Sequence, residues 1–314
     1  MPRFLFQRCL AVFVLSVVWV VPSSAGHAEE SSFGPLHKLA EEGDPVYQYI
    51  LGMMYSLTRT IPNNDRLALL WIDRSANKGY AKAQFELANR HIAGNGVAKN
   101  GALACSWYLK AAEQGHGGAQ TRLGHMHYHG TGCEKSDQKA VLWWQKAAAQ
   151  GEKTAQYPLS VMLEKGIGTA KDPKQALFWC RQAAQQGIAE AQEELADRYQ
   201  MGRGVAKDDK LAVHWWLKAG EQGHTVAQRN LGAMYFLGYG VPKDYVTAYM
   251  WLNLASSNRD RLAKRWRETV AKEMTRSQIA KGQQRASEWL EQRAGNRHEA
   301  EGAREMLTPA IRFP

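Results

Sequence analysis

The sequence lacks a long apolar run beyond its first 28 residues, because charged residues or glycine interrupt every later apolar stretch. A helix that crosses a bilayer needs roughly 20 apolar residues. The composition therefore excludes a membrane span in the later chain. Cysteine is also scarce, and the 4 cysteines are too few for a disulfide-dense scaffold.

The first 28 residues have a different pattern. Arg3 and Arg8 precede the apolar run from Leu10 to Val21, and small residues follow it, which is typical of a secretory signal. We expect residues 1–28 to be a cleaved signal peptide and the mature chain to be exported, either periplasmic or secreted. An uncleaved anchor is the alternative.

Enzyme motifs are missing as well. The sequence contains no Gly-x-Ser-x-Gly elbow, phosphate-binding loop or zinc-protease motif. Ser-x-x-Lys occurs at Ser75 and Ser136, but these serines occupy repeat positions that indicate packing and helix capping respectively. We expect neither enzymatic activity nor a cofactor.

The charge is moderately basic. Loss of Arg3 and Arg8 lowers the formal charge from +10 to +8, and +5 of this lies between Asn258 and Pro314. The repeat region is thus only mildly basic. This charge does not predict a nucleic-acid partner, because an acidic envelope surface would suit it as well as a nucleic acid would.

A 36-residue repeat dominates the chain. Tryptophan, glutamine and glycine each recur six times at this interval. The tryptophans are Trp71, Trp107, Trp143, Trp179, Trp215 and Trp251, the glutamines Gln48, Gln84, Gln120, Gln156, Gln192 and Gln228, and the glycines Gly43, Gly79, Gly115, Gly151, Gly187 and Gly223. A period of this length indicates stacked supersecondary units.

Each unit is predicted to be a helix-turn-helix. Apolar or small residues spaced by four give the first helix one buried stripe, and a Gly-x-Gly pair then ends it in all units but the first. A side chain suited to N-capping starts the second helix. These caps are Asn64, Asn100, Ser136, Asp172, Asp208 and Asp244.

One unit shows the pattern fully: Ala119-Gln120, Leu123-Gly124, Gly130-x-Gly132 and the run Trp143 to Ala148. This pattern resembles the Sel1-like repeat family, relatives of the tetratricopeptide repeats. The resemblance covers roughly Gly34 to Ser257. It implies an all-α, right-handed α-solenoid of six repeats, whose members mostly act as adaptors in signalling or envelope assemblies.

The remaining chain is predicted to close the stack. Residues 34–257 form the solenoid, and residues 258–292 contain two amphipathic segments, the second opened by a capping box of Thr275 and Gln278. We expect these segments to be capping helices. Residues 293–314 lose apolar periodicity and are predicted to be a disordered tail.

Three cysteines follow the signal segment: Cys105, Cys133 and Cys180. All three occupy apolar phases of the repeat, where a free cysteine behaves as a small hydrophobic residue. We expect core thiols, with a Cys105–Cys133 disulfide as the alternative.

Histidine offers the best candidate metal site. His125 and His129 lie four residues apart and would share a helix face, but no third ligand is evident, and His127 occupies an aromatic packing phase. We therefore predict no metal site.

The variable positions of the first helices are the candidate binding residues, because the repeat itself does not explain them. In tetratricopeptide-like stacks this surface lines the concave groove. The candidates run from basic to acidic along the chain: Lys82, Glu86, Asn89, Arg122, His125, His129, Lys165, Glu190, Glu194, Asp197 and Arg229. A solvated face, with Glu193 paired to Arg229, is the alternative.

We expect a monomeric protein-interaction scaffold of the cell envelope that holds a partner protein of complementary charge in this groove. Two alternatives stay open: a cell-wall or β-lactam hydrolase, by family association alone, and a scaffold that binds an envelope polymer such as a polysaccharide.

Overall fold

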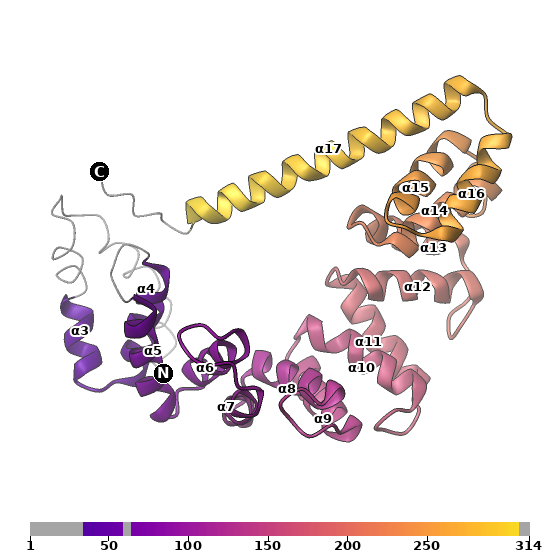
Figure 1. Cartoon of the computed structure of the whole chain (residues 1–314). Helices are drawn as coiled ribbons and strands as arrows, with labels where there is room; N and C mark the ends of the chain where they lie inside the picture. Colours follow the sequence, from indigo (N-terminus) through magenta and orange to yellow (C-terminus); the bar gives the residue numbers. More distant parts are fainter. Residues whose placement is uncertain (1–33, 59–63, 308–314) are drawn as a thin grey trace, which may run out of the picture. The chain divides into compact units, whose positions relative to one another are not determined.

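The computed structural model describes residues 34–58 and 64–307, and all regular structure in these segments is helical (Figure 1). The proposed signal peptide lies outside the described residues. Among the helices of the described segments, none is both long and apolar enough to cross a bilayer. Residues 34–114 and 115–303 belong to two compact units.

Six helix pairs form the repeats. We term the first helix of each pair the A helix and the second the B helix. The A helices are α4 (Pro45–Leu57), α6 (Ala81–Ala93), α8 (Gly117–His129), α10 (Lys153–Lys165), α12 (Ala189–Met201) and α14 (Thr225–Leu237). The B helices are α5 (Asn64–Asn77), α7 (Gly101–Glu113), α9 (Asp137–Ala149), α11 (Pro173–Gln185), α13 (Asp209–Glu221) and α15 (Tyr245–Ser257). The predicted all-α solenoid of six helix-turn-helix units is confirmed.

The helix boundaries follow the predicted signals. Five A helices end at a glycine in the left-handed conformation, such as Gly130 with φ of 71°. At the start of five B helices the predicted cap side chain accepts a backbone N–H, as Asp208 does from Leu211 at 2.9 Å. In the first unit, Asn64 is instead the first residue of α5.

The repeated glutamines join a repeat to the preceding one and also join the A helix to the B helix within a repeat. Gln192 donates from Nε2 to the carbonyl oxygen of Ala184, at the end of the preceding B helix, at 3.0 Å. Its Oε1 accepts a hydrogen bond from Gln222, at the end of the next B helix, at 2.8 Å. The same glutamine–glutamine bond joins Gln114 to Gln84, Gln150 to Gln120 and Gln186 to Gln156. We term these four bonds the glutamine ladder.

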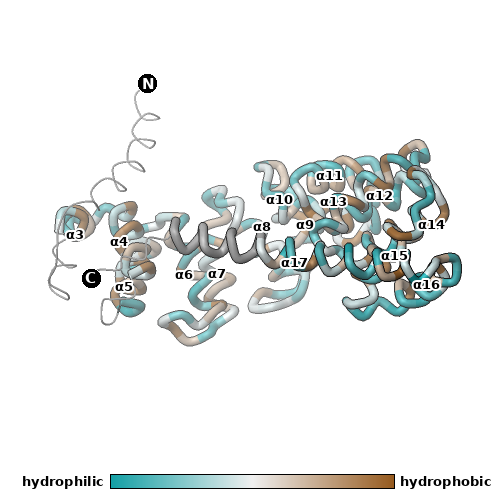
Figure 2. The backbone as a smooth tube through the Cα atoms, turned by 90° about the horizontal axis from the view of Figure 1, so that it is seen from above, coloured by the Kyte–Doolittle hydropathy of each residue, from teal (hydrophilic) through white to brown (hydrophobic). Residues whose placement is uncertain are grey.

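Apolar packing supplies the remaining contact between helices. Alanine and leucine positions of the repeat are fully buried, and Trp144 of α9 and Trp216 of α13 are among the largest buried side chains. The small residue at Gly124 of α8 is required by Trp144, because an added Cβ would lie 2.4 Å from the indole. Figure 2 shows brown apolar and teal polar residues alternating along the helices, as expected of helices buried on one side.

Two further helices follow the last repeat: α16 (Arg261–Lys272) and α17 (Arg276–Leu307). Val270 of α16 is buried with Leu252 of α15, and Ala286 of α17 is buried with Trp251. The Thr275–Gln278 capping box forms, with bonds of 2.8 and 3.2 Å. The capping role of residues 258–292 stays a prediction. The helix α17 extends to Leu307, into the segment 293–314 predicted to be a disordered tail, and residues 308–314 lie outside the described chain.

The cysteines differ from the prediction of three core thiols. Cys180 is a free, fully buried thiol, as predicted. Cys105 and Cys133 are disulfide-bonded, so the expectation that they are free thiols is wrong. The repeat phase correctly identified apolar positions, but an apolar phase does not distinguish a thiol from a disulfide, because both are small and weakly polar.

The free thiol of Cys180 and the disulfide-bonded state of Cys105 and Cys133 can be distinguished by chemical labelling. Burial raises the pKa of the Cys180 thiol to about 12, so thiolate, the reactive form, is scarce at pH 8. We expect maleimide to spare Cys180 in the native protein and to modify it in denaturant without reductant. Cys105 and Cys133 should react only after reduction. Peptide mass spectrometry of the labelled protein checks this, and rapid native labelling of Cys180 would contradict it.

The ladder predicts a stability effect. Gln192→Met keeps the volume but leaves the carbonyl of Ala184 without its side-chain donor, so we expect a loss of about 2 kcal/mol of unfolding free energy. Denaturant unfolding measures it. Gln185→Met, at an exposed position of the preceding B helix, is the control and should change stability by less than about 0.5 kcal/mol. Equal effects of the two substitutions would contradict the role of the ladder.

Candidate partner-binding surface

The candidate residues in the compact unit of residues 34–114 lie on α6. Lys82 is exposed, whereas Glu86 is 3.3 Å from the guanidinium of Arg90 and Asn89 accepts a 2.6 Å hydrogen bond from the hydroxyl of Tyr108. Two of these three predicted binding residues therefore have structural partners. Only Lys82 is left as a plain surface charge.

The basic candidates in the compact unit of residues 115–303 lie on α8 and α10. Arg122, His129 and Lys165 are exposed. His125 is half-buried and its ring contacts Trp144, with centroids 5.2 Å apart. Burial, followed by the positive charges of Arg122 and His129, lowers the pKa of His125. At neutral pH this part of the surface therefore owes its charge mainly to arginine and lysine.

Four carboxylates lie together on α12: Glu190, Glu193, Glu194 and Asp197. Their spacing of three and four residues places them on one helix face. We term them the acidic cluster. The other A helices have no such group at these positions, so the repeat does not account for it.

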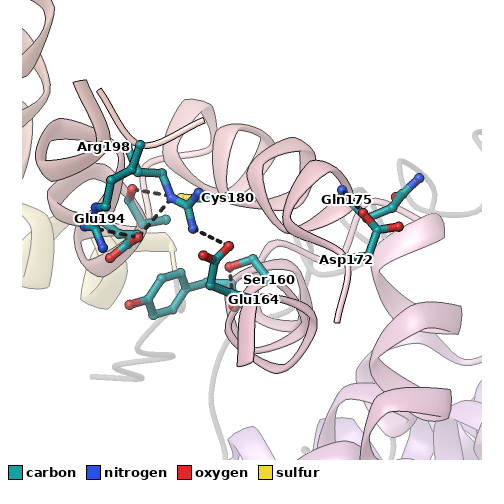
Figure 3. Close-up of polar contacts among 10 residues, drawn as sticks. Ser160, Glu164, Asp172, Gln175, Cys180, Glu194 and Arg198 are labelled. Carbon is teal, nitrogen blue, oxygen red and sulfur yellow. Dashed lines mark hydrogen bonds and ion pairs between the residues drawn. The ribbon is translucent and has the colours of Figure 1, made fainter. Parts of the chain in front are cut away.

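A buried arginine holds one member of the cluster in place. Arg198 of α12 is only 4% exposed, and its guanidinium lies 2.9 Å from both Glu194 and Glu164 of α10 (Figure 3). Removal of one partner of a buried ion pair leaves an uncompensated charge. Glu194 is therefore a structural residue as much as a surface one. Arg198 is not among the binding residues predicted from the sequence, although it shares its repeat phase with Arg90.

The rest of the cluster has less compensation. Glu193 forms no ion pair among the described residues, and burial, followed by the charges of Asp197 and Glu194, raises its pKa to about 7. Burial and Glu194 likewise raise the pKa of Asp197. The hydroxyl of Tyr157 on α10 has a pKa raised to about 12 by burial and then by Glu194. Burial is the largest cause of each of these pKa shifts, and the neighbouring carboxylates add to it.

Residues of α14 border the cluster on its other side. Asn230 donates a 3.4 Å hydrogen bond to Asp197. Arg229 forms its ion pair with Asp260, at 2.9 Å, so the expected pairing of Glu193 with Arg229 is wrong. Asp260 also accepts from the backbone of Ala263 and caps α16, which fixes Arg229 toward the C-terminal helices. We term the side chains that project from α8, α10, α12 and α14, all in the compact unit of residues 115–303, the A-helix face.

The other candidate chemistry has structural explanations. His127 is buried and its Nδ1 lies 2.8 Å from the carbonyl of Glu134, as expected of a packing residue. Ser75 is fully buried and donates to the carbonyl of Pro45, and Ser136 caps α9. In the described segments, no three histidine, cysteine or carboxylate side chains are placed to hold a metal ion.

The six helix pairs, their glycine turns and the glutamine bonds between units define this protein as an α-solenoid repeat protein, in which each unit buries its apolar stripe against the next. The Sel1 repeat family model matches six segments of the chain: residues 45–80, 81–116, 118–152, 153–188, 189–224 and 225–260. The chain belongs to the Sel1 repeat family.

Solved structures agree. The chain is similar to a Sel1 repeat protein from Oxalobacter formigenes, with 33% identity, a TM-score of 0.66, and coverage of 77% of this chain and 70% of that one. It is also similar to c5321, a protective antigen of uropathogenic Escherichia coli strains that displays an SLR fold, with 30% identity and a TM-score of 0.61. That match covers 83% of this chain but only 64% of c5321. No curated protein sequence matches the chain.

Proteins of the Sel1 repeat family generally serve as scaffolds for protein–protein interaction, and the solenoid is typically a non-catalytic fold. The chain therefore has the fold and the family of such scaffolds.

The raised pKa of Glu193 predicts a pH dependence. A carboxyl whose pKa rises from 4.5 to about 7 on folding stabilises the protein fully below pH 4.5, and this contribution is lost as the pH rises through 7. After allowance for solvent screening, we expect a loss of about 1–2 kcal/mol between pH 4.5 and 8. Over the same pH range, the Glu193→Gln variant should lose less unfolding free energy than the wild type, by this amount. Denaturant unfolding across this range measures the difference, and the variant Glu221→Gln, at an exposed position of α13, should follow the wild type.

Proposed function

We propose that this chain is an exported, non-catalytic adaptor. It holds a partner polypeptide on the A-helix face of the compact unit of residues 115–303. The partner segment is basic where it crosses α12 and acidic where it crosses α8 and α10. The proposal rests on one observation above all: Glu190, Glu193 and Asp197 lie on one face of α12, and none of the three forms an ion pair in the described chain.

Keeping Glu193 and Asp197 ionised without an ion pair costs free energy, and the repeat pattern does not require carboxylates at these positions. Glu193 and Asp197 are destabilised as anions, and Arg229, the nearest cation of the next A helix, is directed to Asp260. A lysine or arginine of a partner would lower the free energy of both carboxylates on binding. Complementary charge of this kind also selects partners and accelerates encounter.

The positive end of the face gives the partner a direction. Arg122, His129 and Lys165 are exposed and form no ion pair in the described chain. They precede the acidic cluster by one to two A helices, and α10 is tied to α12 through Glu164 and Arg198. A segment with opposite charges at its two ends therefore fits in one orientation only.

Export is part of the proposal. The N-terminal sequence has the charged, apolar and small-residue regions of a secretory signal. The disulfide-bonded state of Cys105 and Cys133 supports an oxidising compartment, since cytosolic thiols are kept reduced. A periplasmic or secreted location is consistent with both. The hydrolase alternative has no comparable support, because Ser75 and Ser136 have structural roles.

A charge-change experiment tests the binding face. The variant Glu190→Lys with Asp197→Asn raises the net charge by three without touching Glu194, whose loss would leave Arg198 uncompensated. We expect photo-crosslinking from Lys165, replaced by a photoreactive residue, to capture a partner from the envelope fraction, and capture to fall about tenfold or more in the variant. Isothermal titration with a synthetic peptide of the captured segment then measures the affinity.

The matched control is Glu221→Lys with Asp209→Asn, which makes the same charge change on the B helix α13. Capture should be unchanged in this variant, and all proteins should have the same circular dichroism spectrum. Equal loss in both variants would indicate a non-specific charge effect, and undiminished capture in the α12 variant would rule out the acidic cluster as the binding site.

A further inference from the structure

The glutamine ladder ends before the stack does. In the last repeat, Gln228 donates from Nε2 to the carbonyl of Gly220 at 3.0 Å, as Gln84 and Gln192 do to the carbonyls of Ala76 and Ala184. The position that supplies the next rung is Asn258, which is 36 residues after Gln222. Asparagine is one methylene shorter, and its amide forms no hydrogen bond in the described structure. The Oε1 atom of Gln228 is consequently buried without a hydrogen-bond partner, although the residue is only 1% exposed.

A cavity of about 230 Å³ lies at this incomplete rung. Its lining includes Gln228 and Asn258, and its apolar walls are Leu254 of α15 and Trp289 of α17. Arg293 of α17 closes one side: its guanidinium lies 5.1 Å from the Trp289 ring and donates to the carbonyl of Gln222. All these residues belong to the second unit.

We propose that this cavity is a second binding site, which takes a primary carboxamide on a short apolar stem, the chemistry of a glutamine side chain presented by a partner polypeptide. The ligand N–H groups occupy the place that Gln114, Gln150, Gln186 and Gln222 fill in the preceding units, and donate to Oε1 of Gln228. The stem packs between Leu254 and Trp289. This site is separate from the A-helix face, and its test does not depend on that surface.

The lining selects among ligands. Oε1 of Gln228 accepts hydrogen bonds only, so a carboxylate or a ketone of the same shape offers it nothing. An ammonium ion could donate, but it would enter beside the guanidinium of Arg293. A neutral primary amide supplies donors without that repulsion, and a stem of two or three carbons suits the apolar walls.

The first experiment uses butyramide as the probe, with butyrate and pentan-2-one as matched controls. Nuclear magnetic resonance of the full-length protein follows the indole N–H of Trp289, identified by its absence in Trp289→Phe. We expect saturable shifts with a dissociation constant of about 1–10 mM for butyramide, a range set by the small number of ligand atoms. The controls should bind at least about tenfold more weakly.

The second experiment completes the ladder within the chain. Asn258→Gln restores the missing methylene, so its amide should bond to Gln228, raise the midpoint of thermal unfolding by about 2 °C and abolish the butyramide shifts. The same substitution at the exposed turn residue Asn95 is the control, and should change neither quantity.

The outcomes separate clearly. Selective amide binding that Asn258→Gln removes supports the site, and a peptide acetyl-Ala-Gln-Ala-N-methylamide should then bind more tightly than its glutamate counterpart. Equal binding of butyrate and butyramide would assign recognition to Arg293 and overturn the proposal. Absence of butyramide binding, or binding that survives Asn258→Gln, would overturn it as well.

Discussion

The structure depends on one constraint: each repeat must satisfy its buried polar groups through its own two helices and the preceding repeat. The glutamine at the phase of Gln192 illustrates this, because it donates to the carbonyl of Ala184 in the preceding repeat and accepts from Gln222 at the end of its own B helix. A buried amide without both partners would be costly. Apolar contacts have no fixed direction, whereas the bond from Nε2 of the glutamine to a carbonyl of the preceding B helix is directional and favours one register between neighbouring repeats. The repeat of tryptophan and alanine then packs around a geometry that the glutamines set.

This constraint also explains why function is found in the irregular residues. Positions such as Gln156 and Ala140 are identical between units because each must match the same neighbour. The four carboxylates of α12 have no such requirement, and burial, followed by their mutual repulsion, raises the pKa values of Glu193 and Asp197. A solenoid whose stability is distributed over many similar interfaces can tolerate one unfavourable surface. The unfavourable charge then becomes a source of binding free energy for a basic partner.

Most of the fold could be predicted from the sequence, because period, turn glycines and caps are local signals. The site could be predicted only in part. The spacing from Glu190 to Asp197 places these residues on one helix face, but it does not show that Arg198 holds Glu194 against α10, or that Arg229 turns to Asp260. Those choices depend on distances between helices of different units. The sequence offered a disulfide of Cys105 and Cys133 only as an alternative to free thiols, because an apolar repeat phase suits both states.

The two ends of the glutamine ladder show how a repeat protein can acquire a site without a new fold. At the first unit, Lys78 occupies the phase of the donor glutamine and bonds the carbonyl of Gly43 instead, leaving Oε1 of Gln48 unpartnered. At the last unit, Asn258 stops one methylene short and Oε1 of Gln228 borders a cavity. After the sixth repeat the chain continues into α16 and α17, and residues of α17 line the cavity. Recognition of a glutamine-like amide there would use the same bond that assembles the stack.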